Sequence, residues 1–130
     1  MRVLYLIGVP GSGKTTLVRA ALAPLGRPAL VMEPVPHEVY LQAGRPVLVE
    51  VGRQRGTFSG TDALGMAVQP RALAWLSQMP YAAVLLEGDR LANAGFLDGL
   101  RAAGAAVRVV LLDTPPEVAA ARRDARGSRQ

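Results

Sequence analysis

The chain has 130 residues, half of them hydrophobic, and carries 15 basic against 10 acidic side chains for a net charge of +5 at pH 7. This length is typical of one domain with a sizeable core. The absence of cysteine excludes disulfides, thiolate metal sites and cysteine nucleophiles, and no charge-free apolar run approaches the roughly 18 residues of a membrane span.

The N-terminal apolar stretch does not predict a signal peptide, because Gly8 and Pro10 interrupt it and no small-residue cleavage site follows. We therefore expect a single domain over residues 1–130, located in the cytoplasm and without a membrane partner. The positive charge suits nucleic acid or small anions. Aromatic residues make up only 5% and do not alternate with the scattered arginines, which favours a small anion over a polynucleotide.

The first predicted elements are a strand and a helix with a glycine-rich loop between them. Residues 3–7 are an apolar, β-rich run, and residues 16–22 follow a helical pattern that ends before Pro24. Residues 8–15 match the phosphate-binding motif G-x-x-x-x-G-K-S/T in its usual strand-to-helix context. Lys14 is the single lysine, all other basic residues being arginine, and it stands where a flexible ammonium reaches between phosphates.

This loop predicts a site for ATP or another nucleoside triphosphate together with Mg²⁺. Its glycines let the backbone turn and point N–H groups at an anion, and the helix N-terminus adds its positive dipole end. Lys14 is expected to reach the β- and γ-phosphates, and the Thr15 hydroxyl to bind Mg²⁺. The residues expected to contact the nucleotide are Gly8, Pro10, Gly11, Ser12, Gly13, Lys14, Thr15 and Thr16.

Two further strands are expected before the middle of the chain. Residues 29–32 predict a buried strand, and the two prolines between residues 34 and 37 then break the pattern. We interpret His37 as a surface loop residue rather than a catalytic base. Residues 47–51 predict a third strand, which a polar, glycine-rich segment at 52–62 follows.

Two helices are expected in the second half of the chain. One begins at Pro70, because proline suits a first helical turn and apolar residues then recur at intervals of three before Pro80. Trp75 on this helix is assigned to core packing. The other helix begins after Asn93, whose side chain suits an N-cap, and Gly104 closes it.

Residues 82–86 and 107–112 are continuous apolar runs, typical of parallel strands buried on both faces. After the second run, residues 114–117 read Thr-Pro-Pro-Glu, a capping box with proline at the first helical position. The alternation of strands and helices predicts an α/β fold, with a parallel β-sheet sandwiched between helices.

A phosphate loop also needs an acidic group for the metal, and the carboxyl ends of strands are where such groups lie in α/β sheets. Glu87 and Asp89 follow one apolar run, and Asp113 follows the next. We favour Glu87 and Asp89, with Arg90 beside them, because this cluster suits metal binding by Glu87 and deprotonation of an acceptor hydroxyl. Asp113 is interpreted as a turn residue.

Together these motifs resemble the P-loop kinases of the nucleoside and nucleotide kinase-like group, which are related in fold to adenylate kinase. The resemblance rests on residues 8–16, 86–90 and 109–117, with Arg122 and Arg126 beyond them. It implies a P-loop NTPase fold of the kinase-like type and transfer of the γ-phosphoryl group of ATP. It also implies a lid in which Arg122 and Arg126 close over the phosphates. A solvated helix face is the alternative for these arginines.

The same resemblance places the acceptor near residues 53–62. Arg53 and Arg55 are then candidates for bidentate binding of an acceptor phosphate, with Asp62 and Arg90 completing the acceptor site. An ordinary polar loop is the alternative for this segment. Kinases of this group continue with another strand and helix after the lid, so the resemblance implies either a chain trimmed after the lid region or a reduced sheet.

The expected function is therefore ATP-dependent phosphoryl transfer to a small, nucleoside- or nucleotide-like acceptor. A GTPase that reads guanine with N-K-x-D is excluded, because Lys14 is the only lysine. A nucleotide-binding regulator or NTPase, a polynucleotide 5′-end kinase and an antibiotic or other small-molecule kinase remain alternatives. Neither the acceptor, nor the preference for ATP or GTP, nor the oligomeric state follows from the sequence.

Overall fold

The computed structural model of the chain describes residues 1–9, 11–53, 60–65, 67–79 and 83–126. Its strands are β1 (Arg2–Ile7), β2 (Ala29–Val31), β3 (His37–Gln42), β4 (Arg45–Val51), β5 (Ala83–Glu87) and β6 (Ala106–Leu111). Its helices are α1 (Lys14–Leu22), α2 (Gln69–Ser77), α3 (Ala94–Ala102) and α4 (Pro116–Arg126), with two short 3-10 helices, η1 (Ala23–Leu25) and η2 (Thr61–Ala63). The predicted α/β class is confirmed.

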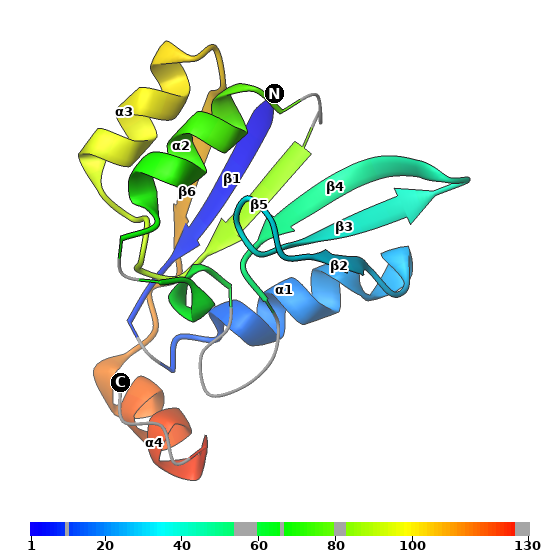
Figure 1. Ribbon diagram of the computed structural model, residues 1–130. Helices are drawn as coiled ribbons and strands as arrows, with labels where there is room; N and C mark the ends of the chain where they lie inside the picture. The colour runs from blue at the N-terminus through cyan, green and yellow to red at the C-terminus, as the bar shows by residue number, and fades with distance from the viewer. Residues whose placement is uncertain (10, 54–59, 66, 80–82, 127–130) are drawn as a thin grey trace.

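The six strands form one mixed sheet in the order β2-β3-β4-β5-β1-β6 (Figure 1). The strands from β4 to β6 in this order pair in parallel, as expected from the alternation of strands and helices. The pairs β2–β3 and β3–β4 are antiparallel, which the sequence interpretation did not include. Only Ala43 and Gly44 join β3 to β4, and both have positive φ angles. A two-residue turn of this kind closes a hairpin and is too short for a parallel crossover.

The interpretation of His37 as a surface loop residue is wrong, because His37 is the first residue of β3. The prolines at 34 and 36 indicated an irregular segment, but β3 begins directly after them and pairs on both sides. His37 is 4% exposed, its Nδ1 lies 2.6 Å from the carbonyl oxygen of Val35, and its ring lies 4.4 Å from that of Trp75. His37 is thus a core residue, and the core role assigned to Trp75 is confirmed.

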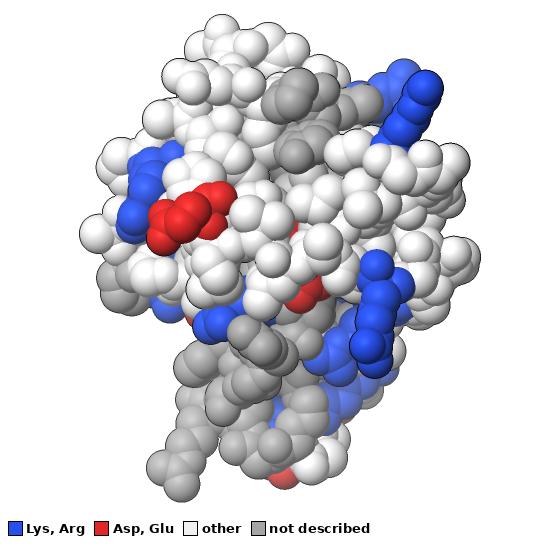
Figure 2. Space-filling view, turned by 45° about the vertical axis from the view of Figure 1, so that its right-hand side comes forward, with Lys and Arg blue, Asp and Glu red and all other residues white. Residues whose placement is uncertain are grey.

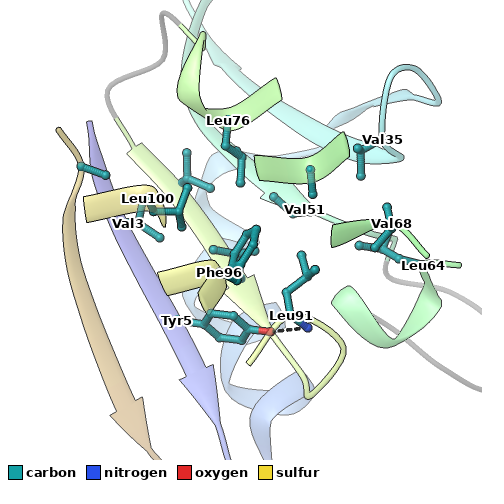
Figure 3. Close-up of a cluster of buried hydrophobic side chains, with 14 residues drawn as sticks. Val3, Tyr5, Val35, Val51, Leu64, Val68, Leu76, Leu91, Phe96 and Leu100 are labelled. Atoms are coloured by element: carbon teal, nitrogen blue, oxygen red, sulfur yellow. Dashed lines mark hydrogen bonds between the residues drawn. The ribbon is translucent and has the colours of Figure 1, made fainter. Parts of the chain in front are cut away.

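One face of the sheet is covered by α2 and α3, which enclose the larger core (Figures 1 and 3). Asn93 caps α3 as predicted, since its Oδ1 accepts a hydrogen bond of 2.9 Å from the backbone N–H of Phe96. Phe96 and Leu100, one turn apart on this helix, are fully buried against β1 and β5 together with Leu76 of α2. Both predicted helices therefore bury the apolar stripes that the sequence shows.

The opposite face is covered by α1, over a smaller core that contains Leu6, Val18 and Leu85. The two ends of the sheet differ from the prediction of buried strands. All three residues of β2 are exposed, and in β6 Val109 and Leu111 are 38% and 63% exposed. Both strands are edge strands, and an edge strand can have a continuous apolar sequence without being enclosed on both faces.

Helix α4 lies beyond the carboxyl ends of the strands, beside the loop that follows β1 (Figure 1). It begins at Pro116, one residue later than the predicted capping box requires, because that motif makes Thr114 the N-cap and Pro115 the first helical residue. The predicted N-cap role of Thr114 is therefore wrong, and its hydroxyl instead donates a 2.9 Å hydrogen bond to the carbonyl oxygen of Ser12. None of the helices in the described ranges is long and apolar enough to cross a membrane.

Candidate functional site

The loop between β1 and α1 turns sharply at its glycines. Gly11 and Gly13 have φ angles of 84° and 99°, a left-handed conformation that glycine adopts without strain. The backbone N–H of Ser12 donates 3.0 Å to the carbonyl oxygen of Val9, which tightens the turn. Gly13 is the N-cap of α1 and provides no side-chain cap, so the helix N-terminus is suited to an anion. Pro10 lies outside the described residues.

Lys14 places its ammonium group inside the curve of this loop. Nζ donates hydrogen bonds to the carbonyl oxygens of Gly8 at 2.5 Å and Val9 at 3.2 Å, and it lies 3.5 Å from the Ser12 hydroxyl. The positive charge is therefore held by oxygen atoms of the loop itself. Thr16, the other polar residue of this turn named from the sequence, is exposed on α1.

Thr15 and Glu87 meet behind the loop. The Thr15 hydroxyl lies 3.1 Å from Oε1 and 3.3 Å from Oε2 of Glu87 and donates to this carboxylate. Glu87 ends β5, pairs in register with Leu6 of β1 and is only 1% exposed. The parallel pairing of β5 with β1 thus brings the predicted metal-binding residues together.

These two side chains fit a magnesium ion. Mg²⁺ prefers hard oxygen ligands and is usually held by one or two carboxylates together with the phosphates of the substrate. The pair supplies one carboxylate and one hydroxyl next to the phosphate loop. In the part of the chain that the structure describes, no group of three or more His, Cys, Asp and Glu side chains forms a metal cage. Thr15 and Glu87 therefore suit a metal that is shared with a bound phosphate.

The backbone of Glu87 is bonded by the buried Thr61 hydroxyl, which in turn contacts the Tyr5 hydroxyl. The Thr61 hydroxyl donates 2.7 Å to the backbone carbonyl oxygen of Glu87 and lies 3.3 Å from the Tyr5 hydroxyl. The Tyr5 oxygen in turn accepts a 3.2 Å hydrogen bond from the backbone N–H of Leu91 (Figure 3). Burial raises the pKa of Tyr5 far above its ordinary value, so the phenol stays protonated and able to donate. The sequence interpretation gave Tyr5 no role.

Asp62 fixes the backbone of residues 88–90, which follow Glu87, through hydrogen bonds. Its Oδ1 accepts hydrogen bonds from the backbone N–H groups of Asp89 at 2.9 Å and Arg90 at 3.1 Å. Gly88, between them and Glu87, has a φ of 103° and packs so closely on Asp62 that a Cβ there would lie 2.8 Å from Oδ2. Asp62, predicted as an acceptor contact, therefore also shapes the acidic turn. The Asp89 side chain is exposed and Arg90 is half-buried.

The two ends of the segment that carries Arg53 pack on each other at Gly52 and Gly60, and Gly60 packs on Glu87. The backbone N–H of Gly60 donates 2.9 Å to the carbonyl oxygen of Arg53, which closes the segment at its base. A Cβ on Gly60 would lie 2.5 Å from Cγ of Glu87, and a Cβ on Gly52 would lie 1.8 Å from the carbonyl oxygen of Gly60. Glycine is thus required at both positions of this stack.

Arg53 is half-buried, and its Nε atom is buried without a hydrogen-bond partner among the described residues. A buried guanidinium N–H that lacks an acceptor is costly, so this position is suited to an anion. Arg55 lies outside the described residues. Arg53 pairs with Gly60, and Gly60 packs on Glu87, so the backbone of Arg53 lies near the acidic residue. An acceptor site near Arg53, as predicted, would require this proximity.

Helix α4 packs against the phosphate loop. A Cβ on Gly11 would lie 2.2 Å from the carbonyl oxygen of Ala119, which is 1% exposed. Arg122, one turn later, donates from Nη1 to the carbonyl oxygen of Gly11 at 3.4 Å. The predicted proximity of Arg122 to the phosphate loop is present, whereas the side chain of Arg126 is not described. The contact through Ala119 was not anticipated from the sequence.

A protein-family model matches nearly the whole chain, including the phosphate loop, Glu87 and α4. The family model for P-loop Nucleotide Kinase3 matches residues 1–129. The chain belongs to this family. Membership in the P-loop nucleotide kinases indicates a kinase-like protein that binds a nucleotide. No curated protein and no solved structure matches the chain.

Proposed function

We propose that this P-loop nucleotide kinase family member transfers the γ-phosphoryl group of ATP, bound with Mg²⁺, to a small, nucleoside- or nucleotide-like acceptor. The hydrogen bond between Thr15 and Glu87 carries the proposal, because it places a buried carboxylate directly behind a phosphate loop. Phosphoryl transfer depends mainly on positioning and charge stabilisation, and both are available from this arrangement.

Different residues of the chain bind the nucleotide phosphates and the metal. Lys14 moves its ammonium from the loop carbonyls to the phosphate oxygens, which are stronger acceptors. Gly11, Gly13 and the N-terminus of α1 bind the phosphates through backbone N–H groups. Thr15 and Glu87 would hold Mg²⁺, which neutralises phosphate charge when bound.

The acceptor side lies across Glu87 from the loop. Arg53 binds an anionic group of the acceptor, and Asp89, exposed next to Glu87, takes the proton of the attacking hydroxyl. The acceptor oxygen forms the new bond to the γ-phosphorus while the bond to the β,γ-bridging oxygen breaks and leaves ADP. Arg122 stabilises the charge on the transferred group from the side of α4, where it contacts the phosphate loop. Arg90 is assigned to the acceptor; the roles predicted for Arg55 and Arg126 rest on the sequence alone.

A small anion is favoured over a polynucleotide by the distribution of charge. On the face that Figure 2 shows, basic side chains lie at the upper right, the left, the lower centre and the lower right, and white surface and acidic side chains separate several of these groups. A continuous basic stripe that follows a nucleic-acid backbone would look different. Small phosphorylated acceptors need only a local pair of arginines.

The test is a screen for acceptor-dependent ADP release. Nucleosides, nucleoside monophosphates, oligonucleotide ends, sugars and aminoglycosides are offered with ATP–Mg²⁺ and, in parallel, with GTP–Mg²⁺. We expect one nucleoside or nucleotide class to accelerate ADP release, and Lys14→Ala to abolish the effect. Binding of ATP without acceleration by any acceptor would instead identify a nucleotide-binding regulator or NTPase.

Arg53 provides a second, sharper test. Arg53→Ala should raise the KM for the acceptor at least tenfold, because a bidentate contact to an anion is lost, while the KM for ATP stays within about twofold. Arg45→Ala, an exposed arginine at the start of β4, is the matched control and should leave both constants unchanged. Equal behaviour of the two variants would move the acceptor away from Arg53.

A further inference from the structure

A second candidate site lies on the α1 face of the sheet, apart from the phosphate loop. It is a groove of about 990 Å³ between α1 and the strands β5, β1 and β6, and none of the described residues of the phosphate loop (8, 9 and 11–15) lines it. Apolar side chains from three strands and α1 form most of its surface, among them Leu4, Leu6, Leu17, Ala21, Leu85 and Val110. Its volume is that of a ligand or peptide site.

The apolar surface of this groove is accessible. Leu4 in the middle of β1 is 37% exposed, and Leu17 on α1 is 46% exposed. On the other face of the same strands, α2 and α3 cover the sheet (Figure 1). Contiguous exposed apolar surface, unlike single exposed apolar residues, is a feature of interaction sites.

Two arginines give the groove a defined charge. Arg2 and Arg108 both line it, both are exposed, and the pairings Arg2 with Ala106 and Leu4 with Arg108 put them at neighbouring diagonal positions on the same face. Within the described residues neither guanidinium forms an ion pair, and no carboxylate lines the groove. Like charges this close destabilise each other, so an anionic partner would be favoured at both.

The charge also excludes one occupant. A second copy of this chain that docked groove to groove would bring Arg2 and Arg108 of both copies together without a carboxylate from either groove. The net charge of +5 opposes such a contact further. The partner must therefore bring acidic groups as well as apolar ones.

The length of the groove's floor fits a helix. The six residues of β1 span about 20 Å at ~3.3 Å per residue, which is the length of about 13 helical residues. Helices pack on sheet faces in α/β domains, and α1 already does so on this face over Leu6 and Leu85.

We propose that this groove docks an amphipathic helix of another protein. Its apolar stripe lies on Leu4 and Leu17, and its acidic side chains pair with Arg2 and Arg108. The site requires neither nucleotide nor phosphoryl transfer, and it goes beyond the proposed function. Because α1 forms its wall and begins at Lys14, the docked helix would contact the same element that binds phosphate.

The test uses a panel of fluorescein-labelled helical peptides of about 13 residues, with leucines at i, i+3, i+4, i+7 and two glutamates whose position varies along the peptide. Fluorescence anisotropy with the full chain measures the affinity. We expect at least one acidic peptide to bind, its Glu→Lys version to bind at least tenfold more weakly, and a scrambled peptide without the stripe not to bind.

Protein variants locate the binding. Arg108→Glu should weaken the best peptide at least tenfold, because it reverses a charge in the groove. Arg71→Glu, the same reversal at an exposed site on α2, should not change the affinity. Leu17→Ser should also weaken binding. Lys14→Ala should bind the peptide as the wild type does, because Lys14 does not line the groove. This variant therefore tests peptide binding independently of the proposed kinase activity.

Four results would overturn the proposal. They are failure of every peptide to bind, equal binding of acidic and basic peptides, equal effects of Arg108→Glu and Arg71→Glu, and dimerisation in sedimentation velocity that Leu17→Ser abolishes. The last result would make the groove a self-association surface. Binding of dodecanoate at the groove without binding of any peptide would likewise replace the helix with a lipid-like amphiphile.

Discussion

Replacing Thr61 by valine tests whether buried hydroxyl groups fix the position of Glu87. Valine has nearly the same shape as threonine, so the change removes the hydroxyl without opening a large cavity. It deletes the 2.7 Å bond to the Glu87 carbonyl oxygen and the 3.3 Å contact with the Tyr5 hydroxyl. Each buried group that loses its partner costs about 1–3 kcal/mol. We therefore expect a loss of about 2–4 kcal/mol in the free energy of unfolding.

The assay is equilibrium unfolding in urea, followed by the fluorescence of Trp75, the single tryptophan of the chain. Thr61→Ser is the control, because it keeps the hydroxyl and should cost only about 1 kcal/mol for the lost methyl group. A double-mutant cycle with Tyr5→Phe should show a coupling energy of about 0.5–1.5 kcal/mol. A stable Thr61→Val protein with no coupling to Tyr5 would refute the proposed network.

Three further predictions concern the site and its surroundings. Gly11→Ala should displace α4, because a Cβ would lie 2.2 Å from the Ala119 carbonyl oxygen, and trypsin should then cleave α4 faster than in the wild type. Glu87→Gln or Asp89→Asn should lower kcat by about 10²–10⁴-fold with ATP affinity largely retained, as steady-state kinetics and calorimetry would show. Burial, with Glu50 and Glu38 nearby, raises the pKa of Tyr40 to about 12, so between pH 10 and 12 the unfolded chain releases this proton before the folded one. Stability should therefore fall as the pH rises, by up to about 1.4 kcal/mol per unit for this group, and less steeply in Tyr40→Phe. An identical slope in that variant would assign the effect to other groups.

The parts of the site that follow from the sequence are those with a local signature. The phosphate loop is a contiguous motif, Glu87 ends a contiguous apolar run, and Asn93 precedes its helix by one residue. Each is defined by backbone geometry within a few residues, so spacing alone identifies it.

The remaining parts depend on partners far apart in the chain. Tyr5 and Thr61 are 56 residues apart, and no pattern of spacing connects them. Thr114 has a valid local pattern for helix capping, but α4 begins one residue too late for it to be the N-cap, and its hydroxyl donates to a backbone carbonyl 102 residues away. Strand β3 was missed for a similar reason, since the prolines before it indicate irregular structure and only pairing with β2 and β4 makes it a strand.

The position of Lys14 has a consequence for the chemical reactivity of the protein. Apart from the α-amino group, its Nζ is the only aliphatic amine of the chain, and it is held within the loop by the Gly8 and Val9 carbonyl oxygens. Any acylation directed at lysine therefore falls on the phosphate loop and removes the charge that binds phosphate. An amine-reactive reagent therefore has two targets, the α-amino group and Nζ, and protection by a nucleotide can be read from the intact mass as loss of the second addition without mutating the chain.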